Sequence, residues 1–423
     1  MWKYVTTPIY YANARPHIGH LYTTVYADAY SRWHRSRGSE VLFTTGMDEH
    51  GLKIQQQSAL LGLSPQEFCD KTAVLFKDLF SRMHIDYTRF YRTTEGKAQT
   101  VAHREAVWSL WRRLDEAGCI YKDMHEGWYC STEERFVQKH QVMPGKKEGT
   151  FMTKEKYLVE WVQEENYFFR IEPLKPKIEA WLRSSALDAG LQEQSLRELH
   201  DCNPISISRP RTRVHWGVPV PGDENHTIHV WLDALTSYVA ALGFPDLDMA
   251  TNPFWKSSFH VLGMEISRFH SVHLPAFLIA AGIPPSSKVK VHCHWLNCSV
   301  KMSKSLNNAV DPEVLIKVAG ADALRFYLLY HGPQNLSNSE FTFADFAKVV
   351  TLLGGRLGNL LSRLTSPSVV RTSVGSSVEL KAPEVYTLEE QQMLQTVVDH
   401  LSKQSTGSVR MNVMKGVTSN KRW

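Results

Sequence analysis

Residues 3–35 decide the fold, and they read KYVTTPIYYANARPHIGHLYTTVYADAYSRWHR. The first five of these residues, 3–7, predict a short strand, and residues 9–16 predict a loop after it. From 18 to 35 the apolar residues recur at helical spacing. They are Leu21, Val25, Ala29 and Trp33. A strand, a loop and a helix in this order indicate the start of an α/β fold.

The same alternation continues along the chain. A second strand is predicted at 41–45, followed by helical patterns at 65–82 and 96–117. Strand, helix, strand and helix indicate a parallel α/β sheet, whose ligands bind at the carboxyl ends of the strands. Further strands are predicted at 228–231, 260–263 and 289–296, and further helices from Asp233 and at 270–281.

Changes in pattern divide the chain into six predicted segments. Residues 119–225 are rich in aromatic and charged side chains, which indicates an α+β insertion between two halves of one α/β domain, 1–118 and 226–288. After Asp311 the pattern becomes mostly helical. Residues 289–340 form a segment that carries a lysine-rich loop, and residues 341–403 form a partial helical domain. Residues 404–423 form a tail that we expect to be disordered.

The composition is that of an ordinary globular protein. Hydrophobic residues make up 43% and charged residues 22% of the 423 residues, which excludes a disordered or fibrous chain. No run of 18 apolar residues predicts a membrane-spanning helix. The net charge of +5 is mild, so bulk charge does not identify a nucleic-acid binder. The six cysteines form no CxxC pair, which fits a reducing compartment.

The first chemical motif is His17-Ile18-Gly19-His20, where the first predicted helix begins. Free backbone N–H groups at a helix start favour an anion, and the two imidazoles could donate hydrogen bonds to phosphoryl oxygens. Gly19 would let a base or a phosphate approach closely. The alternative is that the two histidines only cap and cover the helix.

The second motif is Lys301-Met302-Ser303-Lys304-Ser305, which we call the lysine-rich loop. Two lysines and two hydroxyls within five residues could close on the charge that develops on a leaving pyrophosphate. The alternative is a solvated basic surface loop. No GxxxxGK[ST] sequence occurs, so a P-loop NTPase is excluded.

Together, the two motifs indicate a protein family far more specifically than either motif does alone. HIGH in the first strand–helix turn, with KMSKS 284 positions later (from 17 to 301), resembles the double signature of class I aminoacyl-tRNA synthetases. Residues 4–20, together with TGMDEHG at 45–51, resemble the methionyl-tRNA synthetase family more closely. So do WGVPVPGD at 216–223, VWLDA at 230–234, FHS at 269–271 and GADALR at 320–325, and the resemblance extends from residue 3 to about 365.

This resemblance implies a Rossmann-like catalytic sheet and a methionine pocket. Aromatic walls suit a polarizable thioether, and one carboxylate suffices for the substrate ammonium. On their own, Trp231 and Tyr238 would be read as core residues of a helix. The family's pocket falls on Ile9, Tyr11, Trp231, Ala234, Tyr238 and His270, with Asp48 matching the carboxylate.

The implied reaction is adenylation followed by transfer. The methionine carboxylate attacks the α-phosphate of ATP, which arrives with Mg²⁺, and the 3′ end of tRNA(Met) then takes the methionyl group. We expect a monomer with no membrane partner. The implied catalytic residues are His17, His20, Lys301 and Lys304, and the implied ATP-binding residues are His17, Gly19, His20, Glu265, Lys301, Ser303 and Lys304.

Several positions depart from the family pattern. Many members carry a CxxC zinc knuckle in the insertion, but only Cys130 stands there, so we expect no structural zinc. His292-Cys293-His294 with Cys298 resembles a ligand cluster, but on one strand the two histidines would share a face while Cys293 points to the other. The family's usual Gly-Lys-Asp is Gly263-Met264-Glu265, which weakens the expected ribose contact through Glu265. The glycine that usually precedes the lysine-rich loop is also missing.

The carboxyl-terminal part is the largest departure. Asn359 and Arg363 match the first half of the family's anticodon reader, but residues 341–423 are too few for a closed helical bundle. One reading is therefore an active synthetase, and the alternative is a catalytically impaired, truncated chain that binds tRNA or regulates. Isoleucyl, valyl and leucyl enzymes have a larger insertion, and cysteinyl enzymes need a zinc site. Resemblance to bacterial and mitochondrial members favours the mitochondrial matrix, with the cytoplasm as the alternative.

Overall fold

The computed structural model describes residues 1–130, 135–137, 139–145, 149–154, 157–184, 187–302, 308–333, 336–364 and 366. The chain divides into two compact units, Met1–Val291 and His292–Trp423, which we call unit 1 and unit 2. Within the described ranges, no helix combines the length and the apolar character needed to cross a membrane.

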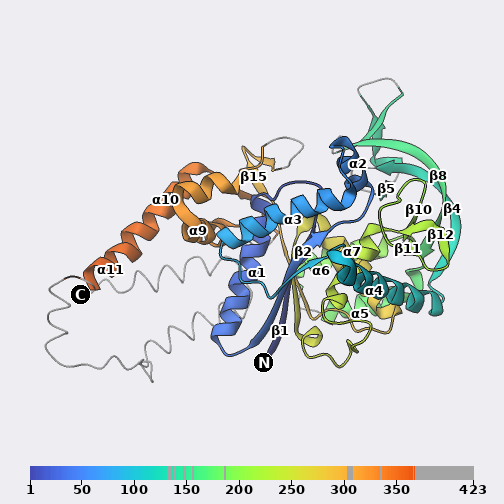
Figure 1. The fold of residues 1–423 in the computed structure, drawn as a ribbon, viewed down its shortest axis with the longest axis horizontal. Coiled ribbons are helices and arrows are strands. Elements are labelled where there is room, and N and C mark those ends of the chain that lie inside the picture. The colour runs from blue at the N-terminus through green and yellow to red at the C-terminus, as the bar shows by residue number, and fades with distance from the viewer. Residues whose placement is uncertain are drawn as a thin grey trace. The chain divides into compact units, whose positions relative to one another are not determined.

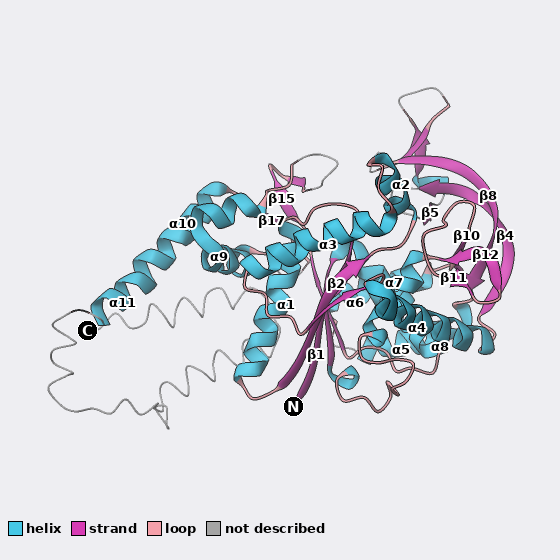
Figure 2. Cartoon of the chain, in the orientation of Figure 1, coloured by secondary structure: helices cyan, strands magenta, loops and turns pink. Residues whose placement is uncertain are grey.

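A five-stranded sheet forms the centre of unit 1 (Figure 2). Its strand order is β14-β13-β1-β2-β3. Strand β1 pairs in parallel with both β13 and β2, and β2 pairs in parallel with β3. The carboxyl ends of these strands therefore lie at one edge of the sheet, where ligands bind in such folds. The strands are β1 (Trp2–Tyr11), β2 (Glu40–Asp48), β3 (Arg89–Arg92), β13 (Ser258–Gly263) and β14 (Lys288–His292).

Helices cover both faces of this sheet. Helix α1 packs along β1 and β2 on one face, and α4 and α7 lie on the other (Figure 1). Helix α3 begins with a capping box, because the Ser64 side chain accepts from the N–H of Glu67 and the Glu67 carboxylate accepts from the N–H of Ser64. The helices of this part are α1 (Ile18–Ser36), α2 (Leu52–Leu60), α3 (Pro65–Arg82), α4 (Gly96–Glu116), α7 (Val230–Ala240) and α8 (Leu274–Ala280).

The segment between α4 and α7 is built around two long antiparallel strands, β4 (Ile120–Cys130) and β8 (Leu158–Phe169). Shorter strands extend this sheet, and a separate three-stranded sheet has the order β10-β12-β11. The remaining elements are β5 (Arg135–Val137), β6 (Val142–Pro144), β7 (Phe151–Thr153), α5 (Lys175–Ser184), α6 (Ala189–His200), β9 (Ile205–Ser206), β10 (Ser208–Pro210), β11 (Pro219–Val220) and β12 (Asp223–Ile228).

The main core of unit 1 joins the sheet to α4, α7 and α8. Trp255 is 1% exposed, and its Nε1 donates a hydrogen bond to the carbonyl of Pro284 at 2.8 Å. The hydroxyl of the buried Tyr4 donates to the carbonyl of Tyr238 at 2.8 Å, which fixes the carboxyl end of α7 to β1. Both bonds satisfy polar atoms that burial would otherwise leave unpaired.

Unit 2 is a small sheet followed by helices. Its strand order is β16-β15-β17, and a two-residue turn, Cys298 and Ser299, joins β15 to β16. The rings of Trp295 and Phe346 both pack on Tyr327 of α9, with Trp295 stacked at 5.7 Å. The elements are β15 (Trp295–Asn297), β16 (Val300–Lys301), α9 (Pro312–His331, kinked at Gly320), β17 (Ser339–Glu340), α10 (Phe343–Leu353), a π-helical turn (Gly354–Gly358) and α11 (Asn359–Leu364).

The predicted α/β class with a central parallel sheet is confirmed, but some predicted elements were wrong. Residues 9–11 are not a loop, because after a bulge they continue β1 by pairing with Gly46–Asp48. Residues 228–231 are not one strand, because β12 ends at Ile228 and α7 begins at Val230. Helix α2 was not predicted at all.

The predicted strand at 289–296 is two strands in two units. Strand β14 ends at His292 and β15 begins at Trp295, so His292 and His294 do not share the face of one strand as the sequence analysis supposed. The expected disordered tail, 404–423, lies outside the described residues.

Candidate active site

The carboxyl ends of β1 and β2 bring three predicted pocket residues together. Tyr11 lies opposite Asp48 in the strand register, and Ile9 lies opposite Gly46. The N–H of Ala12 donates to the carbonyl of Asp48 at 2.9 Å, so the pairing continues to the end of both strands. Asp48 is 7% exposed. A carboxylate is thus held in a nearly buried position beside an aromatic ring, at the edge of the sheet where ligands are expected.

Gly46 allows β2 to approach its other neighbour. A Cβ atom placed on Gly46 would lie 1.8 Å from the carbonyl oxygen of Tyr91 on β3, which is far below van der Waals contact. A larger residue would push β2 away from β3 two positions before Asp48. The glycine of the TGMDEHG stretch is therefore a packing requirement of the sheet.

His17 and His20 form the amino-terminal cap of α1. Nδ1 of His17 accepts from the N–H of Gly19 at 3.0 Å, and Nδ1 of His20 accepts from the N–H of His17 at 3.2 Å. The two rings stack with centroids 3.8 Å apart. Because each Nδ1 is an acceptor, the proton of each neutral ring is assigned to Nε2. The capping role that the sequence left open is present, and it makes Nε2–H the donor of both histidines.

Gly19 leaves room for the ring of His17. A Cβ atom on Gly19 would lie 2.8 Å from Cε1 of His17. The ring of His17 folds over this glycine to reach its N–H, so a side chain there would displace the cap. The glycine supports the orientation of His17 directly.

Three predicted pocket residues lie along one face of α7. Trp231, Ala234 and Tyr238 are three and four positions apart, the spacing of neighbours on a helix surface. The ring of Trp231 stacks on Phe269 with centroids 3.5 Å apart and an interplanar angle of 8°. Ala234 and Tyr238 are buried. The face combines a stacked aromatic pair, a small residue and a phenol.

The phenol of Tyr238 contacts the predicted pocket residue His270. Nδ1 of His270 lies 2.9 Å from the carbonyl oxygen of Ile266, so this nitrogen carries the proton, and Nε2 accepts from the Tyr238 hydroxyl at 2.7 Å. Burial lowers the pKa of His270 to about 4 and raises the pKa of Tyr238 well above its ordinary value. The pair is therefore neutral at pH 7 and adds no charge to the pocket.

The two residues after Asp48 are held by buried charges that the sequence analysis did not assign. Glu49 accepts from Nε of Arg92 at 2.5 Å, and His50 donates through Nδ1 to Oδ2 of Asp233 at 2.6 Å. Both stretches, TGMDEHG and VWLDA, were recognised as motifs, but roles were given only to Asp48, Trp231 and Ala234. The acidic residues and the histidine within those two motifs were the sequence signal from which this network could have been predicted.

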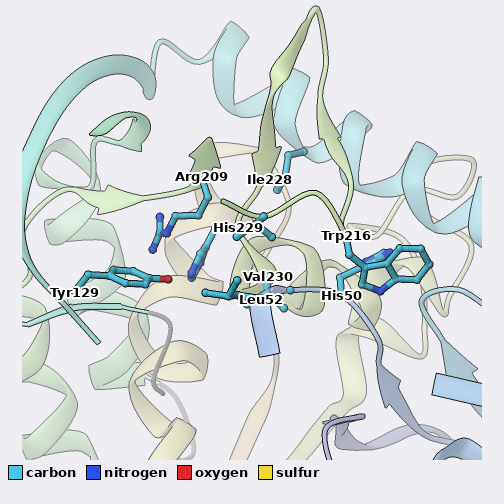
Figure 3. Close-up of a pocket in the computed structure, with 10 residues that line it drawn as sticks. His50, Leu52, Tyr129, Arg209, Trp216, Ile228, His229 and Val230 are labelled. Atoms are coloured by element: carbon cyan, nitrogen blue, oxygen red, sulfur yellow. The ribbon is translucent and has the colours of Figure 1, made fainter. Parts of the chain in front are cut away.

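His50 also lines a pocket between the sheet and the insertion (Figure 3). Trp216 is next to it in the close-up, and the two rings lie 5.9 Å apart. Gly51 donates its N–H to the carbonyl of Trp216 at 2.9 Å, which fixes the pocket wall to the loop after β2. The free volume of the pocket is about 10 Å³, which is room for about one water molecule. The other lining residues are Leu52, Tyr129, Arg209, Val214, Ile228, His229 and Val230.

The remaining predicted residues lie elsewhere. Glu265 is exposed just after β13 and folds toward Gly263, where an added Cβ atom would meet its Oε2 at 2.7 Å. In unit 2, Lys301 is exposed at the end of β16, and Asn359 and Arg363 are exposed on α11. Ser303 and Lys304 of the lysine-rich loop lie outside the described residues.

The comparison with known protein families shows to which family this chain belongs. The family described as "tRNA synthetases class I (M)" matches residues 3–150 and 150–365. The chain belongs to this family. The resemblance to methionyl-tRNA synthetases that the motifs indicated is thereby confirmed.

Individual relatives agree with this membership. The chain is 42% identical to "Methionine--tRNA ligase, mitochondrial" of Xenopus laevis over 374 residues, 86% of this chain and 64% of that protein. It is 39% identical to the Homo sapiens protein of the same name, over 95% of this chain and 70% of that protein. It is 35% identical to "Methionine--tRNA ligase" of Rickettsia bellii over 94% of this chain. The chain thus spans about two thirds of the length of the first two relatives.

Solved structures give the same fold. The crystal structure of Mycobacterium tuberculosis methionyl-tRNA synthetase bound by methionyl-adenylate matches with a TM-score of 0.86 at 32% sequence identity. The match covers 99% of this chain and 82% of that chain. The free state of the same Mycobacterium tuberculosis protein matches with a TM-score of 0.78 at 29% identity. The predicted class I synthetase fold is therefore confirmed.

Proposed function

We propose that this chain activates L-methionine with ATP to form methionyl-adenylate and transfers the methionyl group to the 3′ end of tRNA(Met). This is the reaction of a methionine--tRNA ligase, the name that its relatives carry. The single observation that carries the proposal is the pairing of Asp48 with Tyr11 at the carboxyl edge of the sheet, in a chain that matches a methionyl-adenylate complex at 32% identity.

Asp48 would bind the substrate ammonium. Its carboxylate is nearly buried, and a charge-assisted hydrogen bond in such a place contributes about 1.5–3 kcal/mol. The thioether would lie against aromatic and small apolar groups, which favour a polarizable sulfur over a charged side chain. The proposed pocket consists of Ile9, Tyr11, Trp231, Ala234, Tyr238 and His270.

The phosphates of ATP would meet the amino-terminal end of α1. His17 and His20 each offer an Nε2–H donor there, beside the positive end of the helix dipole. Mg²⁺ would arrive with ATP and supply charge neutralisation on the phosphates. Glu265 is the proposed ribose contact, with Gly19 leaving room for the cap. Lys301, Ser303 and Lys304 are proposed to stabilise the leaving pyrophosphate.

The first test is ATP–pyrophosphate exchange by the purified chain with each of the standard amino acids in turn. We expect exchange with methionine only. Lys304→Ala should abolish it, whereas Lys317→Ala, an exposed lysine of α9, should leave it intact. Exchange with another amino acid would overturn the pocket assignment. Absence of exchange from a folded sample would favour the alternative of a tRNA-binding chain without catalysis.

The recognition of tRNA is proposed to begin with Asn359 and Arg363. They are four positions apart on α11, so both can face one strand of nucleic acid. The test is the affinity of the chain for tRNA(Met) and for a tRNA with another anticodon. Arg363→Ala should weaken binding to the first more than to the second.

Localisation and zinc content are separate proposals. The names of the Xenopus laevis and Homo sapiens relatives place those proteins in mitochondria, and we propose the mitochondrial matrix for this chain. Fractionation of cells that produce it tests this. We also propose that it needs no structural zinc, since Cys130 stands alone in its motif. Metal analysis of the purified protein tests that point.

A further inference from the structure

A carboxylate and two imidazoles meet inside unit 1. Asp233 of α7 is fully buried and accepts from Nδ1 of His50 at 2.6 Å through Oδ2 and from Nε2 of His103 through Oδ1. The other nitrogen of His103 is bonded to the Tyr91 hydroxyl at 2.8 Å. Four side chains from four segments thus form one chain of hydrogen bonds, Tyr91–His103–Asp233–His50.

The ionisation of Asp233 lets the protons of this network be assigned. Burial alone would raise the pKa of Asp233, but His50 and His103 lower it below its ordinary value, through the charge that each ring carries when protonated and through their hydrogen bonds. An ionised carboxylate only accepts, so His50 carries its proton on Nδ1 and His103 carries its proton on Nε2. Nδ1 of His103 then accepts from Tyr91. By the same assignment, Nε2 of a neutral His50 is an acceptor.

The spacing is that of hydrogen bonds rather than of metal ligands. One ligand atom from each of His50, His103 and Asp233 lies within 4.8 Å of the others, which could suit a metal ion. However, two donors bound to one zinc ion at about 2.0–2.1 Å in tetrahedral geometry stand roughly 3.3 Å apart. Nδ1 of His50 and Oδ2 of Asp233 are 2.6 Å apart. A shared proton accounts for this separation, and an ion between the two atoms does not.

The acceptor nitrogen of His50 is placed at a pocket. Nε2 forms no hydrogen bond with any residue that the structure describes, and His50 is one of the lining side chains in Figure 3. Tyr129 and Arg209 are 1% and 3% exposed and close one side of this pocket, with the Arg209 guanidinium over the Tyr129 ring at 5.4 Å.

Two residues that line the pocket are close in sequence to residues of the proposed methionine site. His50 is two residues after Asp48, and Val230, which also lines the pocket, directly precedes Trp231. Methionyl-adenylate bound through Asp48 and Trp231 would therefore lie beside His50.

Only one of the two proposed half-reactions needs a base. In activation the attacking group is a carboxylate that carries no proton. In transfer the attacking group is a ribose hydroxyl, whose proton must leave as its oxygen bonds to the carbonyl carbon.

We propose that His50 is the proton acceptor of the transfer step and that Asp233 is its positioning residue. The ribose oxygen bonds to the carbonyl carbon of methionyl-adenylate and the bond from that carbon to the phosphate oxygen breaks. AMP leaves with the electron pair, and the hydroxyl proton passes to Nε2 of His50. The carboxylate of Asp233 stabilises the imidazolium that forms. This inference rests on the proposed synthetase activity.

The test separates the half-reactions in the full chain. His50→Asn keeps an amide donor for Asp233 but has no second ring nitrogen. Methionine-dependent ATP–pyrophosphate exchange should stay within about threefold of the unaltered chain, while single-turnover transfer from preformed methionyl-adenylate to tRNA(Met) should fall about 100-fold or more. His34→Asn, at the far end of α1 from His17, should change neither rate.

Each outcome of this experiment either supports or overturns the proposed role of His50. Loss of transfer with exchange retained supports the proposal, and so does a parallel loss of transfer in Asp233→Asn. Equal loss of both rates in a folded His50→Asn sample assigns His50 to the methionine site and overturns the proposal, as does transfer at the unaltered rate. If the unaltered chain activates methionine but transfers none, the inference falls and the activation proposal stands. If it does not activate methionine, the proposed function itself falls.

Discussion

Nε of Arg92 lies 2.5 Å from Oε1 of Glu49, and both side chains are buried. Arg92 also donates from Nη2 to Asp70 at 2.5 Å, and the hydroxyl of Thr94 donates to the second oxygen of Glu49. Glu49 directly follows Asp48. The carboxylate proposed to bind substrate is thus followed by a second carboxylate whose position is fixed by a cation on the neighbouring strand.

Removing one partner of this ion pair should destabilise the fold strongly. Arg92→Met would leave Glu49 buried with no cation, which typically costs about 3–5 kcal/mol. The measurement is the free energy of unfolding in urea. The matched control is Arg183→Ala in the exposed pair with Glu179, which should cost less than about 0.5 kcal/mol. Equal effects of the two substitutions would contradict the buried-pair argument.

Three buried histidines should make the protein sensitive to acid. Burial lowers the pKa of His260 to about 3, that of His270 to about 4 and that of His273 to about 3. In the unfolded chain each would titrate near 6.5, so the folded state loses stability as the pH falls from about 6.5 toward these values. Between pH 7.5 and 5.5 we expect a loss of about 1.4 kcal/mol per histidine. Urea unfolding at both pH values measures it.

A substitution at His273 would measure how much one of these histidines contributes to the loss of stability in acid. Neither of its ring nitrogens has a hydrogen-bond partner among the described residues, and its ring packs against Phe269 at 5.1 Å. His273→Phe should therefore be tolerated at pH 7.5 and should reduce the acid-induced loss by about 1.4 kcal/mol. An unchanged loss between pH 7.5 and 5.5 would show that His273 is protonated or exposed in the folded state.

The turn before the lysine-rich loop carries backbone strain. Cys298 and Ser299 have φ values of 51° and 60°, the left-handed conformation that two-residue hairpin turns of this kind require and that glycine or asparagine adopts most easily. Ser299→Gly should stabilise unit 2 by about 1 kcal/mol. Ser339→Gly in the extended strand β17 should destabilise it by about 0.5–1 kcal/mol. Hydrogen exchange of the Met302 amide, which donates to Trp295, reports both effects.

Asp48→Asn should raise the KM for methionine more than it lowers the maximal exchange rate. The substitution keeps the shape but removes the charge that would pair with the substrate ammonium. A charge-assisted bond of about 1.5–3 kcal/mol corresponds to an increase of roughly 10- to 150-fold in KM. Asp86→Asn, whose carboxylate pairs with Arg35 on the exposed surface, is the control and should leave KM unchanged. An unaltered KM in Asp48→Asn would remove Asp48 from the amino-acid site.

Much of the fold was predictable from local pattern. The capping box of Ser64 and Glu67, with Pro65 at the first helical position, marks the start of α3 in the sequence, and the predicted helix at 65–82 has the bounds of the observed one. Apolar residues at helical spacing gave α1 within one residue. The resemblance of the quoted motifs to one family then placed Tyr11 and Asp48 in one pocket, and the register of β1 and β2 does set these two residues opposite each other.

The parts that sequence reasoning missed depend on contacts between distant segments. Residues 9–11 become strand only because β2 is long enough to pair with them past a bulge. The link from His50 to Asp233 spans 183 positions, and no local pattern encodes which histidine faces which carboxylate. Residues 228–231 were predicted as a strand, and period alone does not separate a short buried strand from the start of a buried helix.

The position of β1 in the sheet has a consequence for synthesis on the ribosome. Its neighbour β2 follows after one helix, α1, but its other neighbour, β13, is far away, since Thr6 and His260 are 254 positions apart. At about 5–20 residues per second, translation needs roughly 10 to 50 seconds to produce that second neighbour. During this time one side of β1 is an unpaired edge that can bind other extended chains. The nascent chain therefore has a defined interval in which a chaperone is most useful, and it ends when β13 emerges.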